Sequence, residues 1–469
     1  MAERDIIPYS NEDSDLGMDG CRFKAVHAKT IKADGAEGGL KEYIDTKATK
    51  EELARVEGMI AVASAPNYFT RNTPFAAETH LSIRTPDVLW LNINGKGHKT
   101  ETATNLSVTT PLDWDTKATS WQPSTDYKVG DYVYHEVTSA YIYKCITAGV
   151  SSTLTPVFPT EVGSTVIDGN AKWECCLNYC NADNRAGNDF YIYAIYSRDT
   201  VVPSFILSVN STVPEGYTAE DTRKVGGFHC LCADVGTIEG HMLSGYVKGD
   251  VLPASVWDLK HRPKTDIGGM VYDEGTGIWT SIYLMTWTGT ASAGDLKLYS
   301  KFGAVAGNGA SAEKFHCLKW EQWLGNQNMR LPTWQEFVHL SLGSNQGTNV
   351  AGNARVNTTG GFKDTAGRRM ISHIGAEDCC GNLYQWGAEM GSATTGSSSW
   401  GAGTTVDDSQ VGGQIYGAIY RPLFGGHATG GAPCGSRCCS ADGSALGLGW
   451  GSGCRAISEP AYPSKGITN

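Results

Sequence analysis

The sequence predicts an α+β fold that is mainly β, with an N-terminal helix, small β modules and a larger C-terminal domain. Glycine accounts for 57 of the 469 residues, against the roughly 33 that a usual share of about 7% would give. Aromatic residues make up 10% of the chain, with 13 tryptophans, so the chain can build a core and is not a low-complexity sequence. Short runs alternate apolar and polar residues between Gly, Asn and Pro, which predicts many short strands joined by loops.

Length and charge limit the domain count and the partners. A chain of this length suggests about three domains. It carries 38 Lys and Arg against 49 Asp and Glu, a net charge of −11. Without basic runs we expect no nucleic-acid partner. No apolar stretch reaches about 18 residues, so we expect no membrane insertion. The first eight residues also lack the basic and apolar parts of a signal peptide.

The cysteines predict reduced thiols. There are 14 cysteines, and six of them form three adjacent pairs, at 175–176, 379–380 and 438–439. Without a secretion signal, buried free thiols are the better interpretation than a disulfide framework. No two CxxC motifs are present, so we expect no structural zinc site.

Residues 1–65 are polar except for one short helical seam. Leu53, Val56, Ile60 and Ala63 follow a 3-4-3 spacing, which is typical of a helix that packs against another helix. A helix this short is unstable alone, so we expect it to oligomerise. The alternative is a surface helix packed on its own domain.

Two small β modules are predicted next. In residues 66–118, "DVLWLNI" and "TNLSV" alternate apolar and polar positions, and "NINGKG" predicts a turn. Residues 119–180 space aromatic residues along short strands and resemble carbohydrate-binding modules of the chitin-binding type. Exposed rings would suit sugar faces, but a unit this small needs most of its rings in its own core, which we consider the better interpretation. The rings are Trp121, Tyr127, Tyr132, Tyr143 and Trp173.

Residues 181–469 form the predicted C-terminal domain. "DFYIYAIYS" and "SFILSVN" predict paired strands, and "DEG" at 273–275 predicts a turn. Two helices follow, one in "SAEKFHCLKWEQWLGNQ" and one in "LPTWQEFVHLSLG". In the second, Thr333 as N-cap and Glu336 three residues later form a capping box.

Four segments of this domain occur in the order and spacing of a known fold. "MRLPTWQEFVHLSLG" (329–343), "EDCCGNLYQWGAEM" (377–390), "RPLFGG" (421–426) and "GCRAISE" (453–459) resemble the conserved segments of the formylglycine-generating-enzyme branch of the C-type lectin fold. The resemblance implies a C-terminal C-type-lectin-like domain.

The segment 424–460 resembles the variable region of proteins that a diversity-generating retroelement diversifies. The resemblance implies a fixed frame of Gly425, Gly426, Gly435, Ser436, Arg437, Trp450, Gly453 and Arg455. It also implies positions that vary between copies and contact the receptor, because their residue types are reachable by changing only the adenines of an AAY codon. These are His427, Thr429, Gly430, Pro433, Ser440, Asp442, Gly443, Gly447, Gly449, Gly451 and Ser452. Ala428, Ala432 and Ala441 also pass this criterion and are left unassigned.

Four side chains are predicted to hold the scaffold. The guanidinium forks of Arg437 and Arg455 are expected to pin neighbouring carbonyls, with direct ligand contact as the alternative. Trp386 and Trp450 are expected as core anchors. Residues 446–451 alternate Leu or Trp with Gly, which predicts a strand with one buried and one free face. A glycine-rich strand edge is the alternative.

Enzyme chemistry is not expected. No GxSxG, P-loop or HExxH motif is present. Cys434, Cys438, Cys439 and Cys454 match no copper-binding motif of the formylglycine-generating relatives. The resemblance allows a structural calcium ion, and we expect no other cofactor. The Glu-Pro-Asn and Gln-Pro-Asp signatures of calcium-dependent sugar binding are absent.

These resemblances imply a phage tail-fibre receptor-binding protein. The N-terminus would attach to tail or baseplate proteins, and the C-terminal domain would bind a host-cell receptor, either protein or polysaccharide. A homotrimer is implied, located in the phage tail of the virion after assembly in the bacterial cytoplasm. The alternatives are a diversified binding protein on a bacterial surface and an oxidase-like enzyme with a carbohydrate module.

Overall fold

The computed structural model describes residues 75–461, except 95, 101, 198–199, 355, 357, 393–399, 402–414 and 417–418. The predicted N-terminal helix in 1–65 lies outside these residues.

The chain divides into two compact units, one of Met1–Pro66 with Trp90–Lys99 and one of Asn67–Leu89 with Thr100–Asn469. In the first unit the structure describes one antiparallel hairpin, β3 (Trp90–Ile93) with β4 (Lys96–Lys99). Its turn passes through Asn94 at φ 49°, as the "NINGKG" run predicts.

The second unit begins with a three-stranded antiparallel sheet. It pairs β1 (Ala76–Thr79) with β2 (Ser82–Arg84) and β2 with β5 (Asn105–Ser107). A short 3-10 turn, η1 (Pro111–Asp113), leads to Trp114, which is 3% exposed and stands edge-on to Phe190 at 5.2 Å. Residues of the predicted ranges 66–118 and 181–469 therefore pack against each other. The four domain ranges stay predictions.

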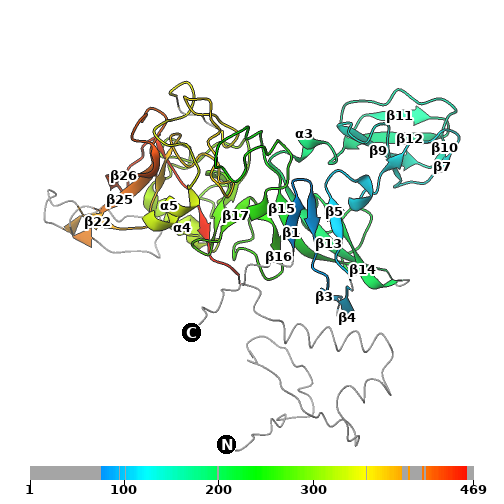
Figure 1. Ribbon diagram of the computed structural model, residues 1–469, viewed down its shortest axis with the longest axis horizontal. Coiled ribbons are helices and arrows are strands. Elements are labelled where there is room, and N and C mark those ends of the chain that lie inside the picture. Colours follow the sequence, from blue (N-terminus) through cyan, green and yellow to red (C-terminus); the bar gives the residue numbers. More distant parts are fainter. Residues whose placement is uncertain are drawn as a thin grey trace, which may run out of the picture. The chain divides into compact units, whose positions relative to one another are not determined.

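Residues 119–177 form a small five-stranded sheet in the order β11-β12-β9-β8-β6. Figure 1 labels β9, β11 and β12 of this sheet. Its strands are β6 (Thr119–Ser120), β8 (Tyr132–Tyr134), β9 (Tyr141–Thr147), β11 (Thr165–Asp168) and β12 (Ala171–Leu177), with a second pair, β7 (Asp126–Tyr127) and β10 (Gly149–Val150). Four of the five aromatic rings singled out above are buried, namely Tyr127, Tyr132, Tyr143 and Trp173. The interpretation that these rings build the core is confirmed for those four.

A four-stranded antiparallel sheet follows in the order β14-β13-β15-β16. The strands are β13 (Asp189–Ser197), β14 (Thr200–Ser208), β15 (Thr222–His229) and β16 (Trp257–Asp258), preceded by the short helix α3 (Ala182–Arg185). The predicted pairing of "DFYIYAIYS" with "SFILSVN" is confirmed, with Ile192 opposite Leu207.

The C-terminal part combines short sheets with two helices. β17 (Met270–Asp273) and β18 (Ile278–Ser281) form a sheet with β28 (Ile457–Ser458), and β19 (Met285–Thr288) pairs with β20 (Lys297–Ser300). Another sheet runs β22-β25-β21-β27, with β26 also on β25. Its strands are β21 (Tyr384–Trp386), β22 (Gly391–Ser392), β25 (Ile419–Gly425), β26 (Gly435–Ser444) and β27 (Ser452–Gly453). A last pair joins β23 (Trp400–Gly401) to β24 (Ile415–Tyr416).

Both predicted helices are present. α4 (Cys317–Gly325) buries Trp320 and Leu324. α5 (Trp334–Leu340) carries the predicted capping box: Glu336 N donates to Thr333 Oγ1 at 3.3 Å and Thr333 N to Glu336 Oε2 at 2.8 Å. Each end of the box satisfies a backbone donor that the first helical turn leaves unpaired.

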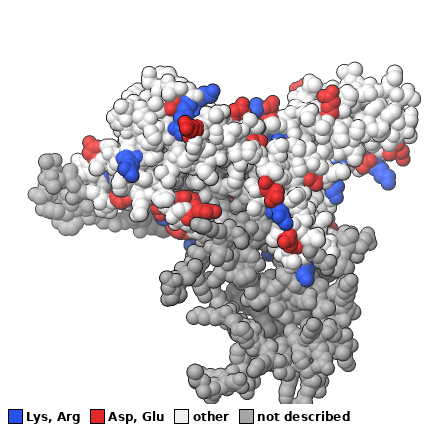
Figure 2. Space-filling view, in the orientation of Figure 1, with Lys and Arg blue, Asp and Glu red and all other residues white. Residues whose placement is uncertain are grey.

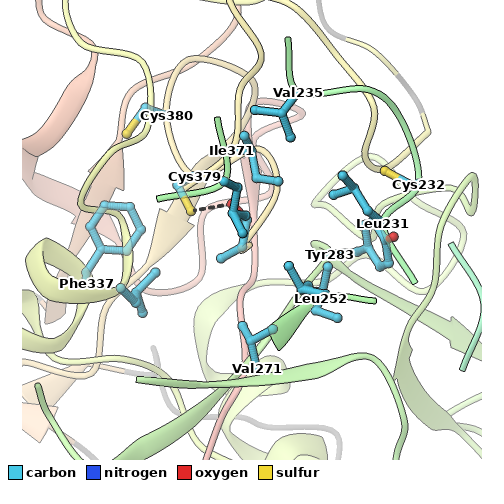
Figure 3. Close-up of a cluster of buried hydrophobic side chains, with 14 of the residues drawn as sticks. Leu231, Cys232, Val235, Leu252, Val271, Tyr283, Phe337, Ile371, Cys379 and Cys380 are labelled. Atoms are coloured by element: carbon cyan, nitrogen blue, oxygen red, sulfur yellow. Dashed lines mark hydrogen bonds between the residues drawn. The ribbon is translucent and has the colours of Figure 1, made fainter. Parts of the chain in front are cut away.

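A large buried cluster joins α5 to the strands around it. Figure 3 shows Phe337 of α5 and the thiols of Cys379 and Cys380 together with Leu231, Leu252, Val271 and Tyr283. The 13 described cysteines are free thiols, and most are buried. Charged side chains lie scattered between uncharged ones on the face in Figure 2. Within the described residues, no helix has the length and apolar character needed to cross a membrane.

Candidate functional site

The segment 424–460 contributes strands to two sheets. It leaves β25 at Gly425, loops back as β26, turns, and then joins β21 through β27 and β18 through β28. β26 runs antiparallel to β25 with Phe424 opposite Cys439, while β27 runs parallel to β21 with Ser452 opposite Tyr384. The segment is therefore tied at both ends to buried strands.

Arg455 anchors the end of this segment. Its side chain is fully buried, and Nε donates to Gln385 Oε1 at 2.9 Å. The remaining guanidinium nitrogens donate to the carbonyls of Ser281, Ile282 and Glu377. The planar guanidinium of Arg455 thus links β21, the end of β18 and Glu377, which confirms the predicted scaffold role. Trp386, at 2% exposure, is confirmed as a core residue.

Two frame glycines have backbone conformations that other residues rarely adopt. Gly425 and Gly426 both have φ +84°. A Cβ on Gly425 would lie 2.3 Å from the Cys379 carbonyl oxygen, and one on Gly426 would lie 2.5 Å from Cys434 Sγ. The sharp turn out of β25 therefore needs glycine at both positions.

The predicted variable residues differ in their exposure. Thr429, Pro433, Asp442 and Gly449 are exposed, and His427, Gly430, Ser440, Gly447 and Gly451 are half-buried. Gly443 and Ser452 are buried. Of the alanines left unassigned, Ala428 is buried and Ala432 and Ala441 are exposed.

His427 lies between two aromatic rings. Its imidazole stands edge-on to Tyr384, with centroids 5.1 Å apart, and tilted to Trp450 at 6.3 Å. Thr429 N donates to His427 Nδ1 at 3.1 Å, and the backbone of His427 bridges to Asn382. We name Tyr384, His427, Thr429, Asp442 and Trp450 the aromatic surface.

The predicted strand over 446–451 is wrong, and so is the buried position of Trp450. β26 ends at Ser444, and Gly447 N donates to the Ser444 carbonyl at 2.8 Å in a turn. No described strand covers 446–451, so Leu448 stays 48% and Trp450 50% exposed. Glycine at every second position also disfavours a strand, because it has no side chain to pack.

The scaffold role of Arg437 is also wrong. Arg437 is exposed on β26, and its guanidinium makes no hydrogen bond or ion pair within the described residues. Ser436 beside it points inward instead, and its Oγ donates to the Ser341 carbonyl at 3.0 Å and accepts from Gln346 Nε2 at 2.8 Å. Neighbouring residues of a strand face opposite sides, so only one of the two can hold the frame.

The structure adds one member to the site that the sequence reasoning missed. Tyr384 is half-buried beside His427. Burial, and then the thiols of Cys438 and Cys434, raise the pKa of Tyr384. The sequence signal for Tyr384 as a site residue was its position in the segment 377–390, two residues before Trp386.

The thiols near this surface are held in the neutral form. Burial, and then Cys438, raise the pKa of Cys434 to about 11, and burial raises that of Cys438 and of Cys439. A neutral thiol is a poor nucleophile and metal ligand. Among the described residues, no group of three or more His, Cys, Asp or Glu side chains is placed to hold a metal ion. Structural calcium stays a prediction.

The fold and this surface define a C-type-lectin-like protein with similarity to phage tail-fibre receptor-binding proteins, which confirms the resemblance drawn from the sequence. Residues 175–258 match the family described as Mtd second domain. The chain is similar to the tail fiber receptor-binding protein of Bordetella phage BPP-1, with 29% identity over 259 residues. That similarity covers 51% of this chain and 63% of the relative, less than two thirds of its length. The fold resembles the Major Tropism Determinant M1 Variant, with a TM-score of 0.55, 20% identity and 83% of each chain covered.

Proposed function

We propose that this chain is a phage tail-fibre receptor-binding protein and that its aromatic surface contacts a receptor on the host cell. The observation that carries the proposal is the separation of frame from surface within one segment. Arg455 is buried and hydrogen-bonded through its guanidinium, and Gly425 and Gly426 are buried where a Cβ would clash. Thr429, Asp442 and Trp450 are exposed. A binding site on a rigid scaffold can change its side chains without unfolding the protein.

The same separation supports diversification of this segment by a retroelement. A Cβ on Gly451 would meet nothing within 4 Å, whereas one on Gly443 would lie 2.7 Å from the Arg421 carbonyl oxygen. Gly451 therefore fits a position that varies, and Gly443 fits the frame. A reverse transcriptase gene and a near-copy of this segment differing only at adenines should lie beside the gene.

The remaining parts of the proposal concern assembly. The N-terminal residues attach to phage tail or baseplate proteins, the chain forms a homotrimer, and the protein resides in the tail of the virion after assembly in the bacterial cytoplasm. Several identical sites on one virion would strengthen weak single contacts through multivalency. The receptor is a protein or a polysaccharide, and the chain is not an enzyme, an assignment that the neutral thiols support.

Host-cell adsorption tests the receptor site. We expect purified full-length chain to bind host cells and to compete with phage adsorption. His427→Ala and Asp442→Ala should each weaken cell binding about tenfold, the usual size of a central contact. The matched controls are His135→Ala and Asp126→Ala, since both residues are exposed and lie within residues 119–177, outside the segment 424–460.

Two results would contradict the proposal. One is cell binding that does not change in either site variant while their folding is intact. The other is an equal loss in the control variants, which would place the contact elsewhere. A signal peptide and neighbouring surface-protein genes in place of tail genes would favour the bacterial surface protein.

A further inference from the structure

A cavity that shares no residue with the aromatic surface lies around the sheet that contains β13, β15 and β16. Its volume is about 480 Å³, within the usual range for small-molecule sites. Its lining comes from these three strands, the loop 262–269 and the first residues of β17 and β18. No residue of the segment 424–460 lines it.

Two N–H donors in the wall of this cavity are unpaired. Arg262 Nε and Trp279 Nε1 are both buried and have no hydrogen-bond partner within the described residues, although both side chains line the cavity. Buried polar groups in folded proteins are nearly always paired. Trp279 is fully buried behind this wall, so the half-buried Arg262 side chain is the one of the two that a ligand with oxygen acceptors can reach.

Charged groups of both signs lie at the same cavity. Lys224 Nζ donates to the Ser211 carbonyl at 2.8 Å and lies 5.0 Å from the centre of the Tyr191 ring. Desolvation, with a smaller effect of the Arg262 charge, lowers the pKa of Lys224, while Asp266 acts in the opposite direction. The cavity therefore offers donors from Lys224 and Arg262 and an acceptor from Asp266.

Asp189 contributes a second acceptor in a fixed position. Its Oδ1 accepts from Gly269 N at 3.0 Å and lies 2.8 Å from His229 Nδ1. A Cβ on Gly268 would lie 2.2 Å from Asp189 Oδ2, so the loop passes close to this carboxylate. Asp189 also lines the cavity.

An indole ring completes the wall. Trp257 of β16 lies against β15, where a Cβ on Gly227 would come 2.7 Å from its Cε2 and Nε1 atoms. The absence of a side chain at Gly227 lets the indole approach the strand closely, and Trp257 stays half-buried. An aromatic ring beside fixed donors and acceptors is typical of sites where C–H faces of a sugar stack and its hydroxyls are hydrogen-bonded.

We propose that this cavity binds one pyranose sugar, with the ring against Trp257 and its oxygens at Arg262, Lys224 and Asp189. A pyranose matches because its hydroxyls both donate and accept, while its ring faces are apolar. This saccharide site consists of residues outside the segment predicted to vary, so it would stay the same while the aromatic surface changes. It does not depend on the proposed receptor site.

Saturation-transfer NMR on the full-length chain tests the proposal. The probes are the methyl glycosides of glucose, galactose and N-acetylglucosamine as the neutral arm and of glucuronic acid as the acidic arm. We expect at least one to bind with a dissociation constant of roughly 1 mM. Arg262→Met and Lys224→Met should each weaken it by about tenfold. Lys128→Met removes an exposed lysine elsewhere and should leave it unchanged.

The outcomes separate this proposal from the receptor site. Sugar binding should persist in His427→Ala, because His427 does not line the cavity. Arg262→Lys keeps the charge and serves as a second variant if Arg262→Met folds poorly; it should retain more binding than Arg262→Met. No binding of any of the four glycosides would overturn the proposal, and so would binding that Lys224→Met leaves intact.

Discussion

The Tyr384 ring stands at 85° to the imidazole of His427, with centroids 5.1 Å apart. Tyr384 comes from the buried strand β21, and His427 from the loop between β25 and β26. The pair therefore joins a fixed residue to a position predicted to vary. An edge-to-face pair of this kind stabilises beyond the area it buries.

We expect this pair to be measurable in a double-mutant cycle. Tyr384→Leu, His427→Leu and the double variant should give a coupling of about 0.5–1 kcal/mol in the free energy of unfolding. Denaturant titration of the full-length chain provides the measurement. A coupling indistinguishable from zero would show that the two rings are independent.

Two glycines of the variable segment should respond in opposite ways to a side chain. Gly443→Val should lower the free energy of unfolding by about 1–3 kcal/mol, because its Cβ would meet the Arg421 carbonyl oxygen at 2.7 Å. Gly451→Val should stay within about 0.5 kcal/mol, because its Cβ meets nothing within 4 Å. Thermal unfolding of both variants decides, and equal losses would contradict the assignment of Gly443 to the frame.

Arg455 and Arg437 form a matched pair for the scaffold. Arg455→Met leaves the carbonyls of Ser281, Ile282 and Glu377 without their donor, so we expect a loss of about 3 kcal/mol or more. Arg437→Met on the exposed face of β26 should change stability by less than about 0.5 kcal/mol. Denaturant midpoints measure both, and Arg455→Lys provides a milder variant if Arg455→Met does not fold. A comparable loss in Arg437→Met would contradict the exposed placement of Arg437.

Asp168 should make the small aromatic module sensitive to acid. Its Oδ2 accepts from Trp121 Nε1 at 2.8 Å and Trp173 Nε1 at 3.0 Å, and its Oδ1 accepts from Ser152 N at 2.8 Å. Burial opposes the charged form, but these hydrogen bonds outweigh it and hold the pKa of Asp168 below its ordinary 3.8. The stabilisation is therefore complete above the unfolded-state pKa and is lost as pH falls from there through the folded-state pKa.

Tryptophan fluorescence reports that transition, because Trp121 and Trp173 both contact the carboxylate. Asp168→Asn should unfold the module more easily at neutral pH and remove this part of its acid dependence. Asp126→Asn, at an exposed position on the same module, serves as the control. An unchanged acid profile in Asp168→Asn would show that other carboxylates govern the loss.

Local patterns predicted much of the fold. The capping box at Thr333 and Glu336 and the paired strands in 189–208 each follow from spacing within a few residues, and Trp386 was expected in the core as a large aromatic residue of a resembling segment. Arg455 was placed in the frame by its resemblance to a closing strand. These predictions succeeded because their partners lie in the same helix, the same hairpin or a conserved segment order.

By itself, the sequence determined a mainly β chain, a lectin-like C-terminal segment order and the residues that compose its predicted variable region. Only the tertiary structure decided which of those residues reach the surface. Alternation in 446–451 predicted a buried Trp450, yet Trp450 is half exposed, while Gly443 is buried against β25. It also decided that Trp257, Arg262 and Trp279 share one cavity. The physical reason is that spacing in a strand or loop separates two faces, but only neighbours distant in the chain determine which face is covered.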